Sequence, residues 1–130
     1  MFLIHTTDDG RIPGFEYLPA AAITPKVGMA LVANSGNLAV ATGTTKPTYI
    51  SMAERDGAVT AGDLIPVVRV QPDMIFEVPL SAAGTSLKSG QKVTIATDGL
   101  QVTATPTDGV AEIVEILGTA VGDKVRVRFA

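Results

Sequence analysis

Short apolar runs broken by glycine and proline constrain the fold more than any other feature of this sequence. The 130 residues include 13 glycines and 8 prolines, a content that favours many short elements joined by tight turns. Turn pairs such as Asp56-Gly57 and Asp98-Gly99 separate the runs, because glycine tolerates positive φ and aspartate stabilises the turn. The chain is therefore expected to be all-β.

The runs have the character of β-strands from Val27 onward. Residues 74–80 alternate, and one parity is the expected core face: its members are Met74, Phe76, Val78 and Leu80. The expected strands cover residues 29–31, 38–40, 49–52, 64–70, 74–80, 93–95, 100–103, 110–117 and 124–129. Such alternation suits a small β-barrel and a sandwich equally well, and both remain open.

Two segments near the C-terminus carry charged residues whose placement depends on the local structure. Residues 109–117 allow either helical turns or a strand, and their β-branched content favours a strand. Glu112 and Glu115 meet on a helix but point to opposite faces of a regular strand. The last strand alternates clearly, which places Arg126 and Arg128 together on a face that meets solvent or a partner.

Residues 1–26 differ in composition from the rest of the chain. They contain Pro13, Pro19 and Pro25, and proline fixes φ and removes a backbone donor, so neither a continuous helix nor a central strand is expected. We expect an extended N-terminal arm with one short strand, or alternatively a loop packed on its own domain. Residues 27–130 are expected to form a single β domain.

Two stretches of that domain resemble each other. Pairs that lie 62 residues apart are Gly28 and Gly90, Leu38 and Leu100, and Val40 and Val102, while Gly62 and Gly122 lie 60 apart. One interpretation is a repeated unit, at about residues 27–70 and 89–129, whose two copies bury their apolar faces against each other. The alternative is coincidence, because glycine, turn and strand recur in any β protein.

Charge and composition exclude several classes of protein. The net charge is −3 and Lys and Arg form no cluster, so the basic surface of a nucleic-acid-binding protein is missing. The absence of cysteine excludes disulfides, thiol chemistry and cysteine-based zinc sites. The apolar start is too short for a signal peptide, and no apolar run is long enough to span a bilayer. We expect a protein made in the cytoplasm, with neither nucleic acid nor membrane as a partner.

Residues able to carry catalysis are few. His5 is the only histidine, and neither a Gly-x-Ser-x-Gly motif nor a phosphate-binding glycine loop is present. We expect no enzymatic activity, no cofactor and no metal; a site assembled from acids and hydroxyls is the lowest-ranked alternative. The densest charge cluster, Glu54-Arg55-Asp56, is interpreted as a solvated loop, with a contact at the rim of a partner as the alternative.

A sequence pattern that covers most of the chain points to a family. It comprises residues 18–20 (Leu-Pro-Ala), 26–32 (Lys-Val-Gly-Met-Ala-Leu-Val), 35–38 (Ser-Gly-Asn-Leu) and 46–52 (Lys-Pro-Thr-Tyr-Ile-Ser-Met), with 87–95 and 118–129 in the second half. In this pattern the chain resembles the small capsid decoration (cement) proteins of tailed phages. The resemblance implies a β-barrel or β-tulip-like sandwich of the virion that binds the outer capsid surface and stabilises contacts between major capsid subunits, with a trimer favoured.

The resemblance also implies which residues make contacts. Apolar side chains of the arm are the expected anchors on the major capsid protein: Phe2, Ile4, Ile12, Phe15 and Tyr17. The charged residues expected at oligomer or rim contacts are Glu54, Arg55, Arg126 and Arg128. The alternative is another virion β module, such as a tail-tube, head-completion or host-receptor-binding domain. Aromatic residues make up only 5% of the chain, which argues against a sugar-stacking surface.

Overall fold

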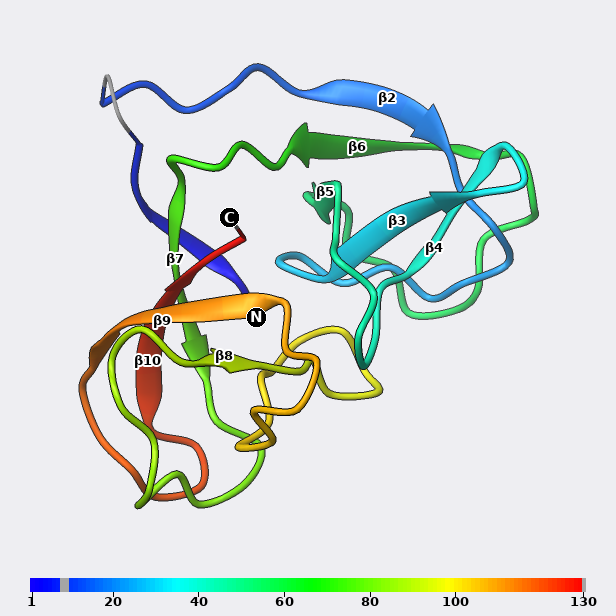
Figure 1. The fold of residues 1–130 in the computed structure, drawn as a ribbon. Coiled ribbons are helices and arrows are strands. Elements are labelled where there is room, and N and C mark those ends of the chain that lie inside the picture. The colour runs from blue at the N-terminus through cyan, green and yellow to red at the C-terminus, as the bar shows by residue number, and fades with distance from the viewer. Residues whose placement is uncertain (8–9, 130) are drawn as a thin grey trace.

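A computed structural model shows the chain as two five-stranded sheets with antiparallel pairing (Figure 1). It describes residues 1–7 and 10–129, so the turn expected at Asp9-Gly10 lies partly outside the described residues. Within those two ranges no helix is present, and the all-β prediction is confirmed. Strands of three to six residues, with one of only two, follow from the short apolar runs and frequent turn residues of the sequence.

Each sheet takes most of its strands from one half of the chain. Sheet A has the order β1-β7-β10-β9-β8, with β1 (Leu3–Thr6), β7 (Ile75–Pro79), β8 (Lys92–Val93), β9 (Ala111–Ile116) and β10 (Lys124–Arg128). Sheet B has the order β2-β6-β5-β3-β4, with β2 (Glu16–Pro19), β3 (Ala30–Asn34), β4 (Asn37–Val40), β5 (Tyr49–Ser51) and β6 (Leu64–Arg69). Isolated bridges, Ala20 to Leu38 and Leu80 to Val102, link further parts of each half without closing a continuous barrel.

Two expected strands in the second half have different outcomes. Residues 111–116 form β9, so the strand interpretation of this ambiguous segment is correct. The strand expected at residues 100–103 is absent, and Val102 forms only isolated bridges. Here the hydroxyls of Thr94 and Thr103 are 2.7 Å apart, and Thr103 Oγ1 accepts a bond from the N–H of Thr105. Such local side-chain bonds compete with a regular ladder.

The N-terminal segment is extended, and it pairs with both sheets. β1 lies against β7 in sheet A, and β2 lies against β6 in sheet B. The backbone N–H of Phe2 donates to the carbonyl of Gly28 at 2.9 Å, and Phe2 is only 1% exposed. The segment therefore packs on its own domain, which was the alternative to a separate arm. Phe2 lies in the core and is not available as the surface anchor that we expected.

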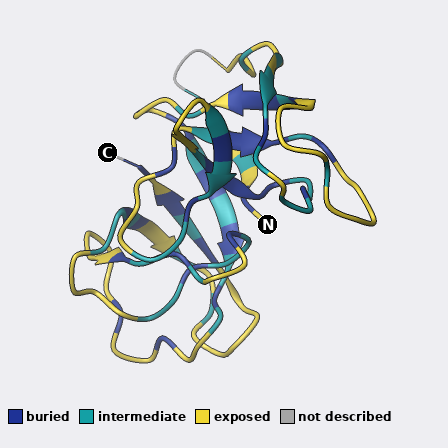
Figure 2. Ribbon diagram, turned by 90° about the vertical axis from the view of Figure 1, so that its right-hand side faces the viewer, coloured by how far each residue is buried: buried dark blue, intermediate teal, exposed yellow. Residues whose placement is uncertain are grey.

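Three phenylalanine rings form the centre of the larger of two core clusters. The Phe2 ring meets Phe76 edge to face, with centroids 6.3 Å apart, and lies 5.4 Å from Phe129. Aliphatic side chains from both sheets surround the rings, among them Ile50, Val68, Val78, Ile113 and Val125. A smaller cluster belongs to sheet B and includes Leu31, Leu38, Ile65 and Val67. Figure 2 shows buried residues along the strands and exposed residues mainly in the loops.

The two halves of the chain repeat a set of backbone hydrogen bonds. Gly28 N–H donates to Ser51 and Gly90 N–H donates to Ile113, at an offset of 62 residues in both donor and acceptor. In the same way Ala20 bonds to Asp63 and Leu80 bonds to Asp123, at an offset of 60. The ladder β2–β6 therefore corresponds to β7–β10, with Pro19 opposite Leu64 and Pro79 opposite Lys124. The correspondence thus includes β2 and β7, which lie outside the units expected from sequence.

Gly28 shows why the N-terminal residues fit closely. Its φ is +81°, and a Cβ at this position would lie 2.5 Å from the Cβ of Met1. Gly90, at the corresponding place in the second half, has a φ of +94° but no atom within 4 Å of the same added carbon. Both positions favour glycine for the backbone conformation, and only Gly28 also needs it for packing.

Replacing Phe2 by alanine is expected to lower the free energy of unfolding by about 3–5 kcal/mol, because a buried aromatic ring leaves a cavity against Phe76 and Phe129. Equilibrium urea unfolding measures this loss. As a control, Leu117→Ala removes a side chain that is 48% exposed, and its effect should stay within about 0.5 kcal/mol. Similar losses in the two variants would show that the N-terminal residues are not part of the core.

Gly28→Ala and Gly90→Ala form a matched pair. Both variants carry the cost of a non-glycine residue at positive φ, about 1–2 kcal/mol. Gly28→Ala must in addition displace Met1 and Phe2, so we expect it to be the less stable variant in thermal unfolding. Equal melting temperatures for the two variants would contradict the close packing of the N-terminal residues on Gly28.

Candidate functional site

The described residues contain no arrangement typical of a catalytic or metal centre. Over residues 1–7 and 10–129, no group of three or more His, Cys, Asp or Glu side chains is placed to hold a metal ion. The same part of the chain contains no helix that is long and apolar enough to cross a membrane. The candidate site is therefore sought among surface features that suit binding.

A cavity of about 280 Å³ lies beside β1 and brings two of the expected anchors together. Its lining residues are Ile4, His5, Thr6, Thr7, Gly10 and Ile12. Ile4 is partly buried against the core, whereas Ile12 is 65% exposed. The hydroxyl oxygen of Thr7 is buried without a hydrogen-bond partner among the described residues. The cavity combines apolar walls with an unsatisfied polar atom, which suits a contact with another molecule.

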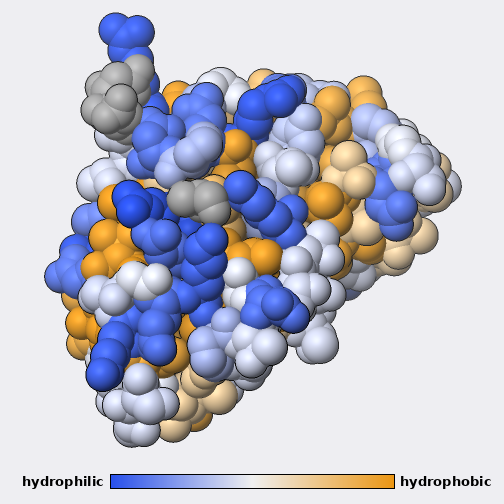
Figure 3. Space-filling view, in the orientation of Figure 1, coloured by the Kyte–Doolittle hydropathy of each residue, from blue (hydrophilic) through white to orange (hydrophobic). Residues whose placement is uncertain are grey.

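A second feature is an outer apolar patch, which we define as Phe15, Tyr17 and Leu64. Their exposed fractions are 56%, 63% and 60%, although all three are large and apolar or aromatic. Tyr17 stands opposite Pro66 and Pro19 opposite Leu64 in the β2–β6 ladder, so these side chains share one face. Figure 3 shows hydrophobic side chains at the surface along the edge of the molecule that carries β2. Exposed apolar residues that gather in this way mark interaction surfaces.

Leu64 was not singled out from the sequence, although a signal was present. It shares parity with Pro66 in β6, while the alternate residues Ile65 and Val67 are buried in the smaller core cluster. Period-two alternation therefore places Leu64 on the outer face. An apolar residue at a polar-facing position is the signal that could have identified it.

Arg126 and Arg128 lie on the outer face of sheet A, but their charges are already paired. Arg126 bonds to Glu115 at 2.7 Å and approaches Glu77 at 3.4 Å, and Arg128 bonds to Glu112 at 2.7 Å. The hydrogen bond to the Glu115 carboxylate raises the pKa of the Arg126 guanidinium. We name these five side chains the ion-pair row. Both arginines thus contribute to the sheet itself.

The ion-pair row corrects one expectation. Glu112 and Glu115 were expected on opposite faces of a strand, yet they bind arginines that share one face of β10. The reason is a bulge in β9: Arg126 stands opposite Glu115 whereas Val127 stands opposite Ile113, which leaves Val114 as an extra residue. A bulge shifts the alternation by one residue, so glutamates three positions apart reach the same side.

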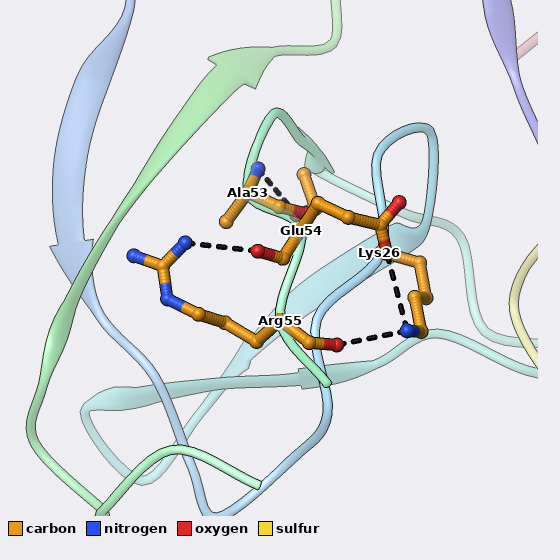
Figure 4. A network of polar contacts seen from close by, with 5 residues as sticks. Lys26, Ala53, Glu54 and Arg55 are labelled. Atoms are coloured by element: carbon orange, nitrogen blue, oxygen red, sulfur yellow. Dashed lines mark hydrogen bonds and ion pairs between the residues drawn. The ribbon is translucent and has the colours of Figure 1, made fainter. Parts of the chain in front are cut away.

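Glu54 and Arg55 belong to a small network in the loop after β5 (Figure 4). Lys26 Nζ donates to the backbone carbonyl of Arg55 at 2.8 Å and lies 3.2 Å from the Glu54 carboxylate. The Arg55 guanidinium donates to the backbone carbonyl of Glu54 at 3.0 Å. The Lys26 and Glu54 side chains are 38% and 53% exposed, so the ion pair is screened by solvent and contributes little stability. This arrangement suits a solvated loop.

Comparison with known proteins adds no assignment. No protein-family model matches the chain, and no curated protein matches it either. The surface features beside β1 and β2 therefore remain the basis for a functional interpretation.

Arg126→Ala removes the central charge of the ion-pair row. We expect the free energy of unfolding to fall, and the loss to shrink as salt is added, because ions screen partly exposed pairs. Urea unfolding at low and high salt measures both effects. Arg55→Ala is the control, since the Arg55 guanidinium bonds to the backbone carbonyl of its neighbour and should show little change. A salt-independent loss for Arg126→Ala would contradict an electrostatic role.

Proposed function

We propose that this protein is a structural component of a tailed-phage virion that binds the outer surface of the capsid and stabilises contacts between major capsid subunits. The proposal assigns no catalysis to the chain, no cofactor and no metal. The major capsid protein is the partner. The resemblance of residues 18–52 and 87–129 to decoration proteins suggested this function, and the surface of the N-terminal segment supports it.

The exposed apolar side chains of residues 12–17 are the observation that carries the proposal. Ile12, Phe15 and Tyr17 are each more than half exposed. An apolar side chain left in water forgoes about 1.5–3 kcal/mol of burial free energy, which a partner surface can recover. The segment joins β1 to β2 and so runs between the two sheets at the surface of the molecule (Figure 1). Repetition over a symmetric shell multiplies a modest contact per copy.

The proposal is tested by co-sedimentation of the protein with empty expanded heads of its phage. The wild-type chain should bind saturably, and Ile12→Asp should weaken binding about tenfold or more, because a charge is placed in an apolar contact. Val121→Asp is the matched control: Val121 is 66% exposed, as Ile12 is 65% exposed, but it lies in the turn before β10.

The outcomes separate the interpretations. Weaker binding by Ile12→Asp alone supports a capsid contact at the N-terminal segment. Equal binding by all three proteins moves the contact to another face. Absence of binding by the wild-type chain refutes decoration. Heads that carry the protein should also rupture at a higher temperature than bare heads, and identical rupture temperatures would remove the stabilising role.

A further inference from the structure

The outer edge of β2 presents backbone groups that no strand of this chain uses. β2 is the end strand of sheet B, and within the described residues its ladder is with β6. The N–H of Ala20 donates to Asp63, so the even-numbered residues of β2 turn their backbone groups toward β6. The N–H and C=O groups of Phe15 and Tyr17 consequently point away from the sheet. Pro66, opposite Tyr17, has no N–H to donate, which agrees with this alternation.

The second half of the chain shows what such an edge accepts. β7 corresponds to β2 at an offset of 60 residues, and its outer edge is covered by β1. The pairing residues of β7 are Glu77, opposite Leu3, and Ile75, opposite Thr6. Subtracting 60 from 77 and 75 gives Tyr17 and Phe15. The repeat therefore identifies these two positions as the acceptors of an antiparallel strand.

The other sheet edges are protected in ways that β2 lacks. β1 has an irregular register between Ile4 and Thr6, β8 is only two residues long and carries Lys92, and β4 is joined to Ala20 by a bridge. Bulges, short strands and lysines are the devices that keep sheet edges from pairing. Between residues 12 and 19 the only charged side chain is Glu16.

We propose that β2 pairs with β2 of a second copy of this chain, antiparallel about a two-fold axis beside Glu16. Phe15 then stands opposite the partner's Tyr17, and Tyr17 opposite the partner's Phe15. Each of these pairs exchanges both of its backbone hydrogen bonds, as in any antiparallel ladder. The two copies of sheet B become one continuous sheet. The outer apolar patches of the two copies meet across the axis, because directly opposite side chains share a face.

Charge permits this pairing. Two Glu16 side chains meet at the axis, and like charges directly opposite each other destabilise a sheet. Each Glu16 carboxylate, however, already accepts two bonds from Arg69 of its own chain, at 3.2 Å each. Arg69 also lies over the ring of Tyr49, 5.4 Å from its centroid, which fixes the guanidinium in place. The axis therefore carries two neutralised ion pairs.

The pairing makes the protein a dimer, in place of the trimer that the family resemblance implies. It is independent of the proposed capsid contact, since Ile4 and Ile12 lie outside the paired residues. The mass in solution decides the matter. Sedimentation equilibrium of the wild-type chain should give twice the 13.4 kDa of one chain, with a monomer appearing on dilution.

Substitutions at Tyr17 separate the backbone bonds from the ring. Tyr17→Ala removes the ring and keeps the N–H, and should raise the dimer dissociation constant about tenfold to a hundredfold. Tyr17→Pro removes the ring and the outward N–H but leaves the β2–β6 ladder intact, so it should raise the constant at least about tenfold further. Circular dichroism of both variants checks that they fold.

If the proline variant does not fold, Phe15→Lys replaces it, because lysine blocks edge pairing without altering the backbone. Leu117→Lys is its control, a half-exposed site away from β2 that should leave the dimer unchanged. Ile12→Asp should also leave the dimer unchanged, which separates this result from head binding. A monomer at every concentration, a trimer, or a dimer that persists in folded Tyr17→Pro or in Phe15→Lys would overturn the proposal.

Discussion

Packing of the Phe2 ring against Phe76 and Phe129 is the contact on which the arrangement of this molecule depends. The three rings come from the two ends of the chain and from β7 in its middle. Once Phe2 is buried, β1 is held along the edge of β7, and residues 10–15 must cross to sheet B to reach β2. The bond from Phe2 to Gly28 joins the same ring to the first half. One buried side chain thereby fixes the course of the whole N-terminal segment.

Most strands could be predicted because period-two alternation is a direct consequence of strand geometry. Residues 74–80 and 124–129 show this well, since the expected core face of each is buried. The N-terminal segment could not be predicted in the same way. Its prolines argue against a central strand, which is correct, but they say nothing about edge pairing. Phe2 and Phe15 have the same side chain in the same irregular segment, and only the tertiary contacts make one buried and the other exposed.

The charged face of sheet A shows a second limit. Sequence alternation placed Arg126 and Arg128 on one face, and both lie on the outer face in the structure. The positions of Glu112 and Glu115 depended on a bulge at Val114, and a bulge has no reliable sequence signal in a β-branched run. The surface beside β2 was anticipated in part, through Ile12 and Tyr17. Leu64 completes it only because the β2–β6 register brings it alongside Pro19.

Contact between residues 2 and 129 has a consequence for biosynthesis. The two rings are separated by almost the whole chain, and their packing needs the last strand. Non-local contacts of this kind slow folding, because a long loop must close before any contact rewards it. While a ribosome is still adding β10, Phe2 and Phe76 lack their third ring and sheet A lacks the strand that joins β7 to β9. The domain therefore completes its core only after translation has passed residue 129, and the nascent chain must be kept from aggregating until then.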